Sequence, residues 1–233
     1  MHLYVVVEGY TEEAFVKQVL APHLATFSVW AVPIIVTTSR DRSTGAKHRG
    51  GGDWEKWKKD LDRLSGRRHR REMHITTLFD LYRLPHNFPD YELLAAMTDT
   101  TKRAAAMEAA MAAQINDRRF IPYLQRHEVE AFVLVDLDPL AELVGEETTA
   151  SGVAALRVDI AGLDPESIND GAETAPSKRL LRFIPDYRKT LHGPLVMEAI
   201  GLPKIRAACP RFDAWVGSLE ALGADPHAAE GTP

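Results

Sequence analysis

The chain has 233 residues, 45% hydrophobic and 26% charged, which is typical of one large globular domain or one domain with an appendage. Its net charge of −5 argues against a protein that coats nucleic acid indiscriminately. No apolar run reaches the roughly 18–20 residues of a membrane span, no signal peptide is visible, and one cysteine excludes a disulfide framework. We therefore expect a cytoplasmic protein with no membrane contact.

The first residues predict a strand and then a helix, with acids at the junction. Leu3–Val7 is short, apolar and β-branched, as buried strands are, and residues 11–20 have apolar positions at helical spacing. Glu8 then stands at the carboxyl end of the strand, and Glu12 lies in the first turn of the helix. Two carboxylates held this close repel each other unless a cation lies between them, so the pair predicts a metal site.

Strands and helices alternate through the next hundred residues. We predict strands over 28–38, 74–79 and 120–125, helices over 54–64 and 100–116, and loops over 39–53 and 84–90. Pro33 suggests an edge position or a bulge, and Asp53 is a candidate helix cap. Residues 127–136 begin either as a strand end or as the first turn of a helix. This order predicts an α/β fold, a mostly parallel sheet flanked by helices.

The texture of the sequence changes after residue 138. Residues 139–175 mix a short helix with a polar loop, and 177–222 resemble helices broken at a few glycines and prolines. The predicted breaks are at Pro185, Gly193, Pro194, Pro203 and Pro210. We expect a core over 1–138, a C-terminal helical extension over 139–222 and a loose tail over 223–233.

Acids follow the predicted strands at three separate places. These are Glu8 with Glu12, Asp80, and Glu128 with Glu130. The carboxyl ends of parallel strands meet at one edge of a sheet, where converging carboxylates would hold Mg²⁺ or Mn²⁺. In a strand, Glu128 would point away from Glu130 and is the weaker candidate. A zinc site is not expected, because cysteines are too few and Ala131 stands where a second zincin histidine would be.

Positive charge concentrates between residues 40 and 71, which makes a phosphate-contacting surface one interpretation and a solvated helix with a basic loop the other. The candidates for nucleic-acid contact are Arg40, Arg42, Lys47, Arg49 and Arg70, with Arg179 and Lys189 later in the chain.

Three short motifs resemble the toprim fold, and most closely its form in the overcoming-lysogenization-defect (OLD) nucleases. They are E-G-x-T-E at residues 8–12, F-D-L-Y at 79–82 and H-E-V-E at 127–130. Further similarity, including P-S-K at 176–178 and C-P-x-F-x-x-W at 209–215, extends over nearly the whole chain to a family of uncharacterised bacterial toprim-like proteins. The usual second motif is Asp-x-Asp, and Tyr82 replaces its second Asp, so we expect one well-bound metal instead of two.

The resemblance implies a metal-dependent nuclease that acts on DNA or RNA and could be the effector half of a phage-defence pair. It also implies a separately encoded ABC- or SMC-type ATPase as partner, since this chain has no P-loop motif. The implied metal ligands are Glu8, Glu12, Asp80 and Glu130, with Glu128 as a further candidate. Similarity to a lysine of the OLD nucleases implies that Lys178 reaches the metal site, although the sequence alone favours a surface lysine near a helix N-terminus.

His127 has several interpretations. It could ligate the metal, contact phosphate or protonate the leaving group, and it could equally be a packing histidine. Two other functions also fit the same acids: a non-catalytic toprim-like module that binds nucleic acid or a partner protein, and a phosphoryl-transfer enzyme that acts on a small nucleotide.

Overall fold

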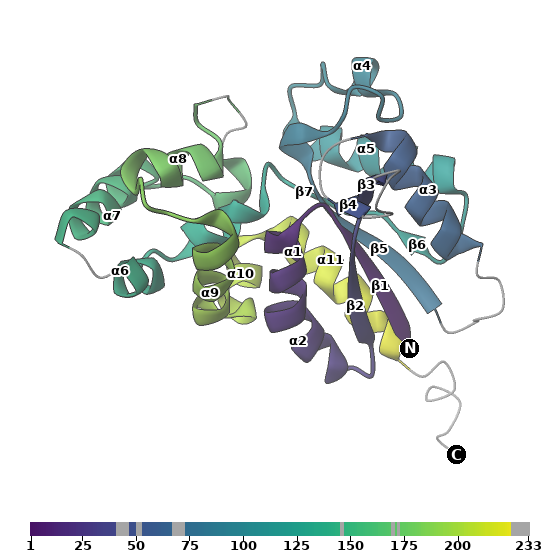
Figure 1. The fold of residues 1–233 in the computed structure, drawn as a ribbon, viewed down its shortest axis with the longest axis horizontal. Helices are drawn as coiled ribbons and strands as arrows, with labels where there is room; N and C mark the ends of the chain where they lie inside the picture. Colours follow the sequence, from purple (N-terminus) through teal and green to yellow (C-terminus); the bar gives the residue numbers. More distant parts are fainter. Residues whose placement is uncertain are drawn as a thin grey trace.

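A parallel sheet forms the centre of the computed structural model (Figure 1), which describes residues 1–40, 47–49, 53–66, 73–144, 147–168, 171 and 173–224. The strands are β1 (His2–Val7), β2 (Trp30–Ile35), β5 (Met73–Asp80), β6 (Phe120–Ile121) and β7 (Leu124–Gln125). Their order is β2-β1-β5-β6, β7 also pairs with β5, and every one of these pairings is parallel. The predicted α/β fold with a mostly parallel, helix-flanked sheet is confirmed.

Strand β1 lies inside the sheet, whereas β2 is an edge strand. Val5, Val6 and Val7 are fully buried, as expected where helices cover both faces of a parallel sheet. Pro33 lies in β2 opposite Val5. Proline has no amide hydrogen to donate, so it is tolerated at a sheet edge, as the sequence predicts.

The predicted strand over 120–125 is divided into β6 and β7. Pro122 stands between them, and side chains of β5 bind the backbone at this break. The Thr76 hydroxyl donates to the Ile121 carbonyl at 2.6 Å, and the Thr77 hydroxyl donates to the Tyr123 carbonyl at 2.9 Å. Two short strands with side-chain bridges thus replace one continuous ladder.

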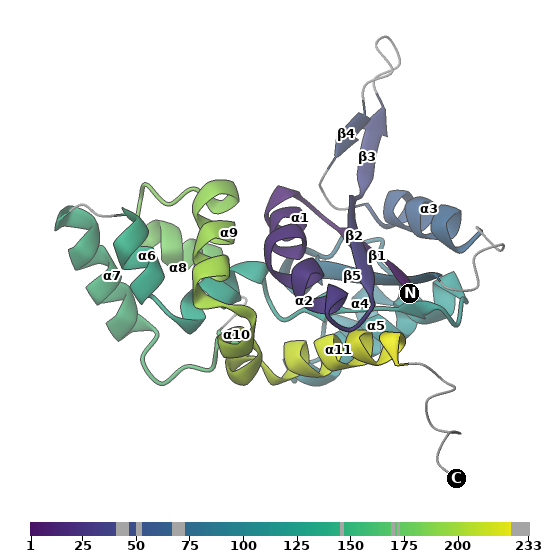
Figure 2. The same ribbon diagram turned by 90° about the horizontal axis from the view of Figure 1, so that it is seen from below.

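Each face of the sheet has its own layer of helices. One face carries the continuous helix α1 (Tyr10–Phe15), η1 (Val16–Leu20) and α2 (Ala21–Ala25), together with α11 (Pro210–Glu220) (Figure 2). The other face carries α3 (Trp54–Ser65), α4 (Tyr91–Leu94) and α5 (Thr100–Ile115). Because side chains alternate along a strand, Leu3, Val5 and Val7 join the first layer and Val6 joins the second.

The C-terminal helices extend the fold sideways. They are α6 (Asp138–Val144), α7 (Glu147–Asp159), η4 (Pro165–Ser167), α8 (Pro176–Phe183), α9 (Lys189–Ile200), α10 (Leu202–Ala208), α11 and η5 (Ala221–Gly223). Helices α6, α7 and α8 lie beside the sheet, and α9 packs against α1 (Figures 1 and 2).

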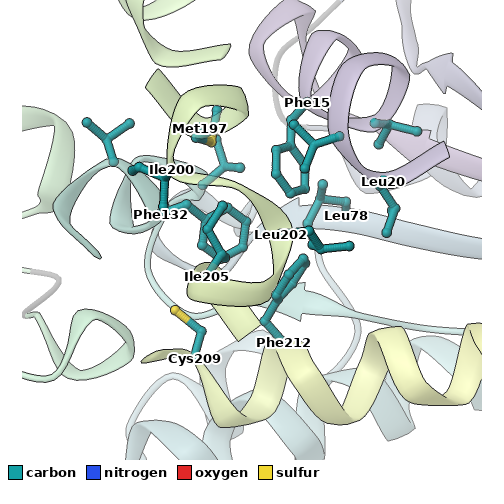
Figure 3. Packing of buried hydrophobic residues seen from close by; sticks show 14 of the residues in the cluster. Phe15, Leu20, Leu78, Phe132, Met197, Ile200, Leu202, Ile205, Cys209 and Phe212 are labelled. Carbon is teal, nitrogen blue, oxygen red and sulfur yellow. The ribbon is translucent and has the colours of Figure 1, made fainter. Parts of the chain in front are cut away.

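One apolar cluster connects the sheet to these helices (Figure 3). Phe132 lies with its ring centroid 5.2 Å from that of Phe15 and 4.5 Å from that of Phe212. Since Phe212 belongs to α11, residues beyond 138 complete the core on this face. The division into 1–138 and 139–222 stays a prediction.

Three local expectations are corrected. The predicted loop over 39–53 contains strand β4 (Lys47–Arg49), which pairs antiparallel with β3 (Thr37–Arg40). Gly193 and Pro194 lie inside α9 and do not break it. Pro194 is the sixth residue of α9, so its missing amide removes one hydrogen bond near the helix start while packing on α1 holds the rest. In place of the one short helix expected over 139–175, the structure has α6 and α7.

Within the described ranges, no helix is both long and apolar enough to cross a bilayer. Most of the predicted tail, residues 225–233, lies outside those ranges.

Candidate metal centre

A cleft of about 710 Å³ opens where the carboxyl ends of β1 and β5 meet the first turns of α1, α8 and α9. It is lined by Glu8, Gly9, Tyr10, Thr11, Glu12, Asp80, Pro85, Glu128, Ser177, Lys178, Leu181, Tyr187, Lys189 and Thr190. Ligands of open parallel sheets bind at this edge, so the cleft lies where the strand-end acids predict a site.

Three buried carboxylates converge beside this cleft. Asp80 ends β5, and Glu128 and Glu130 stand at the start of η3 (Val129–Val135), a 3₁₀ segment. One oxygen from each lies within 4.8 Å of the other two, and none of the three residues is more than 9% exposed. We call these three residues the acid cluster.

The backbone at His127 explains why both glutamates reach the acid cluster. His127 has φ +64°, in the left-handed region, and Glu128 is extended before the 3₁₀ turn begins. The alternation of a strand therefore does not apply, and the expectation that Glu128 points away from Glu130 is wrong. The turn is fixed to β5, because Asp80 Oδ1 accepts the Val129 amide at 3.0 Å.

Glu128 is also held by the first turn of α8. Its Oε2 accepts the Ser177 amide at 2.8 Å, and its Oε1 accepts the Ser177 hydroxyl at 2.9 Å. The first amides of a helix have no partner within the helix, and a carboxylate is favoured there. This contact gives the P-S-K motif a role that sequence alone does not reveal.

Glu8 and Glu12 border the acid cluster on the β1 side. Glu8 Oε1 accepts the Asp80 amide at 2.7 Å, which joins the ends of β1 and β5. Glu12 is 4% exposed, and its Oε2 lies 3.2 Å from where a Cβ on Gly9 would stand. Gly9 therefore leaves room for the Glu12 carboxylate to lie over the strand end.

Lys189, the first residue of α9, places its ammonium against the acid cluster. Its Nζ lies 2.9 Å from Glu130 Oε1 and 4.0 Å from Asp80 Oδ2. Burial alone would lower the pKa of Lys189, but the charges of Glu130, Asp80 and Glu12 raise it. The sequence predicts Lys189 as a nucleic-acid contact, whereas the structure places it among the acids.

One ammonium does not neutralise this much negative charge. Burial raises the pKa of Asp80 well above its usual value, and the charges of Glu12, Glu8 and Glu130 add to the rise, although Lys189 opposes it. Burial raises the pKa of Glu130 to about 7, with Glu128 and Glu12 adding to it against Lys189. Within the described residues, Glu130 Oε2 has no hydrogen-bond partner.

These features fit a hard divalent cation. Asp80, Glu128 and Glu130 would hold it, since Mg²⁺ and Mn²⁺ prefer carboxylate oxygens. The buried Oε2 of Glu130 has no hydrogen-bond partner within the described residues and is free to ligate a cation. Glu8 and Glu12 are close enough to contribute charge, and further ligands could reach the cation from solvent through the cleft.

Three further predicted site residues, Lys178, His127 and Arg179, have different surroundings in the structure. Lys178 lines the cleft and, within the described residues, forms no ion pair. His127 is 1% exposed, and its carbonyl accepts the Tyr82 amide at 3.1 Å, so the backbone of His127 supports the turn. Arg179 pairs with Asp159 and donates to the Thr174 carbonyl, and it does not line the cleft.

The basic segment is only partly described. Arg40, Lys47 and Arg49 lie on the β3–β4 hairpin, which projects from the sheet edge in Figure 2. Arg42 and Arg70 lie outside the described residues. Their contact with nucleic acid stays a prediction.

Sequence reasoning missed Ser177 and Tyr187 as cleft residues. Ser177 stands inside a recognised motif, but only the folded chain shows it bound to Glu128. Tyr187 belongs to no motif, and it reaches the cleft from a part of the sequence that is distant from the strand-end acids.

Comparison with known proteins gives a family but no activity. Residues 7–220 match the model of the family described as "Domain of unknown function (DUF4276)". The C-terminal region of the Xanthomonas campestris pv. campestris OLD protein is a structural neighbour at 14% identity, covering 98% of this chain and 97% of that chain. Its TM-score of 0.45 is too low to support an argument. No curated protein matches this chain. The match over 7–220 shows that the chain belongs to the DUF4276 family.

Proposed function

We propose that the protein is a divalent-metal-dependent nuclease that hydrolyses phosphodiester bonds of DNA or RNA at a toprim-like site. The observation that carries this proposal is the acid cluster: three buried carboxylates beside an open cleft, with an unused oxygen and too little positive charge to balance them. Several buried carboxylates with one ammonium among them are typical of sites that bind a cation.

A divalent cation held there would activate water and neutralise the charge of a bound phosphate. The residues of the chain support that chemistry in separate ways. Lys189 offsets part of the negative charge of Asp80 and Glu130, and Lys178 is available to the cleft for a phosphate oxygen. Tyr82 stands where a second metal-binding Asp would be expected, so we propose one tightly held ion, Mg²⁺ or Mn²⁺.

The rim of the cleft favours a nucleotide-containing substrate. The Tyr10 side chain is 62% exposed and Leu181 is 46% exposed, and both line the cleft together with the acids. An apolar rim above a charged floor suits a base attached to a phosphate. The motifs shared with OLD nucleases further suggest that the protein works as the effector of a phage-defence pair with a separately encoded ATPase.

A second candidate is phosphoryl transfer on a small nucleotide. The volume of about 710 Å³ favours it, because typical small-molecule sites have about 300–1,000 Å³. The same acids and the same cation would serve both reactions, so only the substrate distinguishes the two functions.

The experiment is a cleavage assay with and without Mg²⁺ or Mn²⁺ on supercoiled plasmid, single-stranded DNA, single-stranded RNA and mononucleotides. We expect nicking or shortening of polymers that EDTA stops and that Asp80→Asn and Glu8→Gln abolish. Cleavage of mononucleotides alone would support the second candidate. Metal binding without cleavage of any substrate would contradict both and favour a non-catalytic module.

A further inference from the structure

Tyr187 lines the cleft and has a buried side-chain hydroxyl. The residue lies two positions before α9, is 3% exposed and lines the cleft. Within the described residues, its hydroxyl has no hydrogen-bond partner. A buried hydroxyl without a partner lowers stability, so its retention requires a reason.

Tyr123 shows what a buried tyrosine ordinarily does in this fold. It is also 3% exposed, and its hydroxyl donates to Gln125 Oε1 at 2.7 Å. Buried tyrosine hydroxyls usually find such a partner. Tyr187 therefore departs from the rule that the same molecule follows elsewhere.

The space around the Tyr187 hydroxyl is kept open by a glycine. A Cβ on Gly193 would stand 3.0 Å from this oxygen, closer than most real Cβ contacts, so a larger residue would crowd it. Gly193 belongs to α9, where alanine would favour the helix more strongly. Glycine at this position therefore lowers the helix propensity but leaves space around the hydroxyl.

Burial and the neighbouring acids keep this hydroxyl protonated. Burial raises the pKa of Tyr187, the charges of Glu130 and Glu128 raise it further, and Lys189 opposes them. A neutral phenol is a hydrogen-bond donor as well as an acceptor. The cleft that Tyr187 lines also holds Lys178 and Lys189, which are cations suited to an anionic ligand.

Building on the proposed function, we infer that the Tyr187 hydroxyl is reserved to donate a hydrogen bond to an anionic oxygen of the phosphoryl group that enters the cleft. The hydroxyl is unsatisfied in the empty cleft because its acceptor arrives with the substrate. Tyr187 is then a catalytic residue that contacts the reacting phosphate directly, distinct from the carboxylates that hold the cation.

Tyr187→Phe tests this inference, with Tyr123→Phe as the matched control. Without ligand, we expect Tyr187→Phe to keep or raise the melting temperature, because it removes an unsatisfied hydroxyl, whereas Tyr123→Phe lowers it by breaking a hydrogen bond. With Mn²⁺ and inorganic phosphate, wild type and Tyr123→Phe should gain thermal stability that Tyr187→Phe largely lacks. In the cleavage assay, kcat of Tyr187→Phe should fall about 10- to 100-fold, the value of one hydrogen bond to a charged group.

Gly193→Ala provides a second variant that leaves the tyrosine in place. Its methyl group should displace the hydroxyl, so phosphate-dependent stabilisation and kcat should fall in the same direction as in Tyr187→Phe, by a smaller factor. A Gly193→Ala protein with full phosphate response would contradict the positioning of the hydroxyl.

Three outcomes would overturn the inference. A fall in melting temperature of Tyr187→Phe equal to that of Tyr123→Phe would show a structural hydroxyl. A Tyr187→Phe protein that binds phosphate and cleaves like wild type would overturn the inference and leave the nuclease proposal intact. A wild type that neither cleaves nor responds to Mn²⁺ and phosphate would overturn both.

Discussion

Two clusters of charged side chains in this molecule are built in opposite ways. The first, which we call the paired cluster, consists of His23, Arg206, Asp213 and Glu220 and ties α2 to α10 and α11. Glu220 Oε1 lies 2.6 Å from His23 Nε2 and also accepts from Arg206, which in turn donates to Asp213. Every carboxylate of this cluster therefore has a cationic partner.

The acid cluster lacks this balance. Burial would raise the pKa of Glu220, but hydrogen bonds from Arg206 and His23 more than offset it and leave the pKa lowered. In Asp80 and Glu130, burial wins over Lys189, and the pKa of each is raised. The sign of the pKa shift thus distinguishes the two clusters: the paired carboxylate of Glu220 stabilises the fold, whereas Asp80 and Glu130 are held at a cost. A cost of this kind is typical of functional sites.

The largest expected effect separates the two clusters by activity. Glu130→Gln should lower metal-dependent cleavage by about a thousandfold or more, because the neutral amide is a poor ligand for a hard cation. At about pH 8 it should not lower stability, since it removes a carboxylate that is costly to ionise. Glu220→Gln should leave the cleavage rate unchanged and lower the stability instead. Equal losses of activity in both variants would remove the distinction.

Metal binding should stabilise the protein through the acid cluster. At Mn²⁺ or Mg²⁺ concentrations a hundred times the Kd, the free energy of unfolding should rise by about 2.7 kcal/mol at pH 8. The gain should shrink towards pH 5, because protons compete for carboxylates whose pKa is raised. Differential scanning fluorimetry with and without the metal, at pH 8 and pH 5, measures the gain and its loss as shifts in melting temperature. Glu130→Gln should lose the gain and Glu220→Gln should keep it.

Removing the ammonium from the acid cluster should have a smaller, pH-dependent effect. Breaking a buried ion pair costs about 3–5 kcal/mol, but the Lys189 side chain is 41% exposed, so we expect about 1–2 kcal/mol for Lys189→Met at pH 8. At pH 5 the loss should shrink, since Glu130, whose pKa is raised to about 7, is then protonated, and the raised pKa of Asp80 acts in the same direction. Arg206→Met in the paired cluster should lose stability at both pH values. Urea unfolding in EDTA at pH 5 and pH 8 compares the two variants. A pH-independent loss in Lys189→Met would contradict the idea that Lys189 offsets the charge of Asp80 and Glu130.

Local pattern accounts for the parts of this site that the sequence predicts. The strand over residues 2–7, the strand that ends at Asp80 and the long helix over 100–115 all have clear periodicity or a continuous apolar run. Because the sequence predicts a parallel sheet, we expect Glu8 and Asp80 at the same edge of that sheet. The Asp80 amide donates to the Glu8 carboxylate, as this expectation requires.

Long-range packing decides the parts that the sequence does not predict. The direction of Glu128 depends on a left-handed backbone at His127, which is rare for any residue other than glycine. The approach of Lys189 depends on α9 packing against α1 and η3, and the same packing keeps Gly193 and Pro194 inside a helix. No short window of sequence contains both sides of these contacts.

The most gradual expected effect is a slope in stability against pH. The folded pKa of Glu130 is raised to about 7 from 4.5, so the folded state holds this proton more tightly than the unfolded chain. Its contribution is complete below about pH 4.5 and is lost as pH rises to 7, with a slope of up to about 1.4 kcal/mol per pH unit. Urea titrations in EDTA between pH 5 and 7 should show this fall in wild type and a shallower one in Glu130→Gln. Glu220, whose pKa is lowered, contributes stability that is lost only at lower pH, so Glu220→Gln should keep the wild-type slope. If Glu130→Gln also keeps that slope, the Glu130 carboxylate is no more costly to ionise than those of the paired cluster.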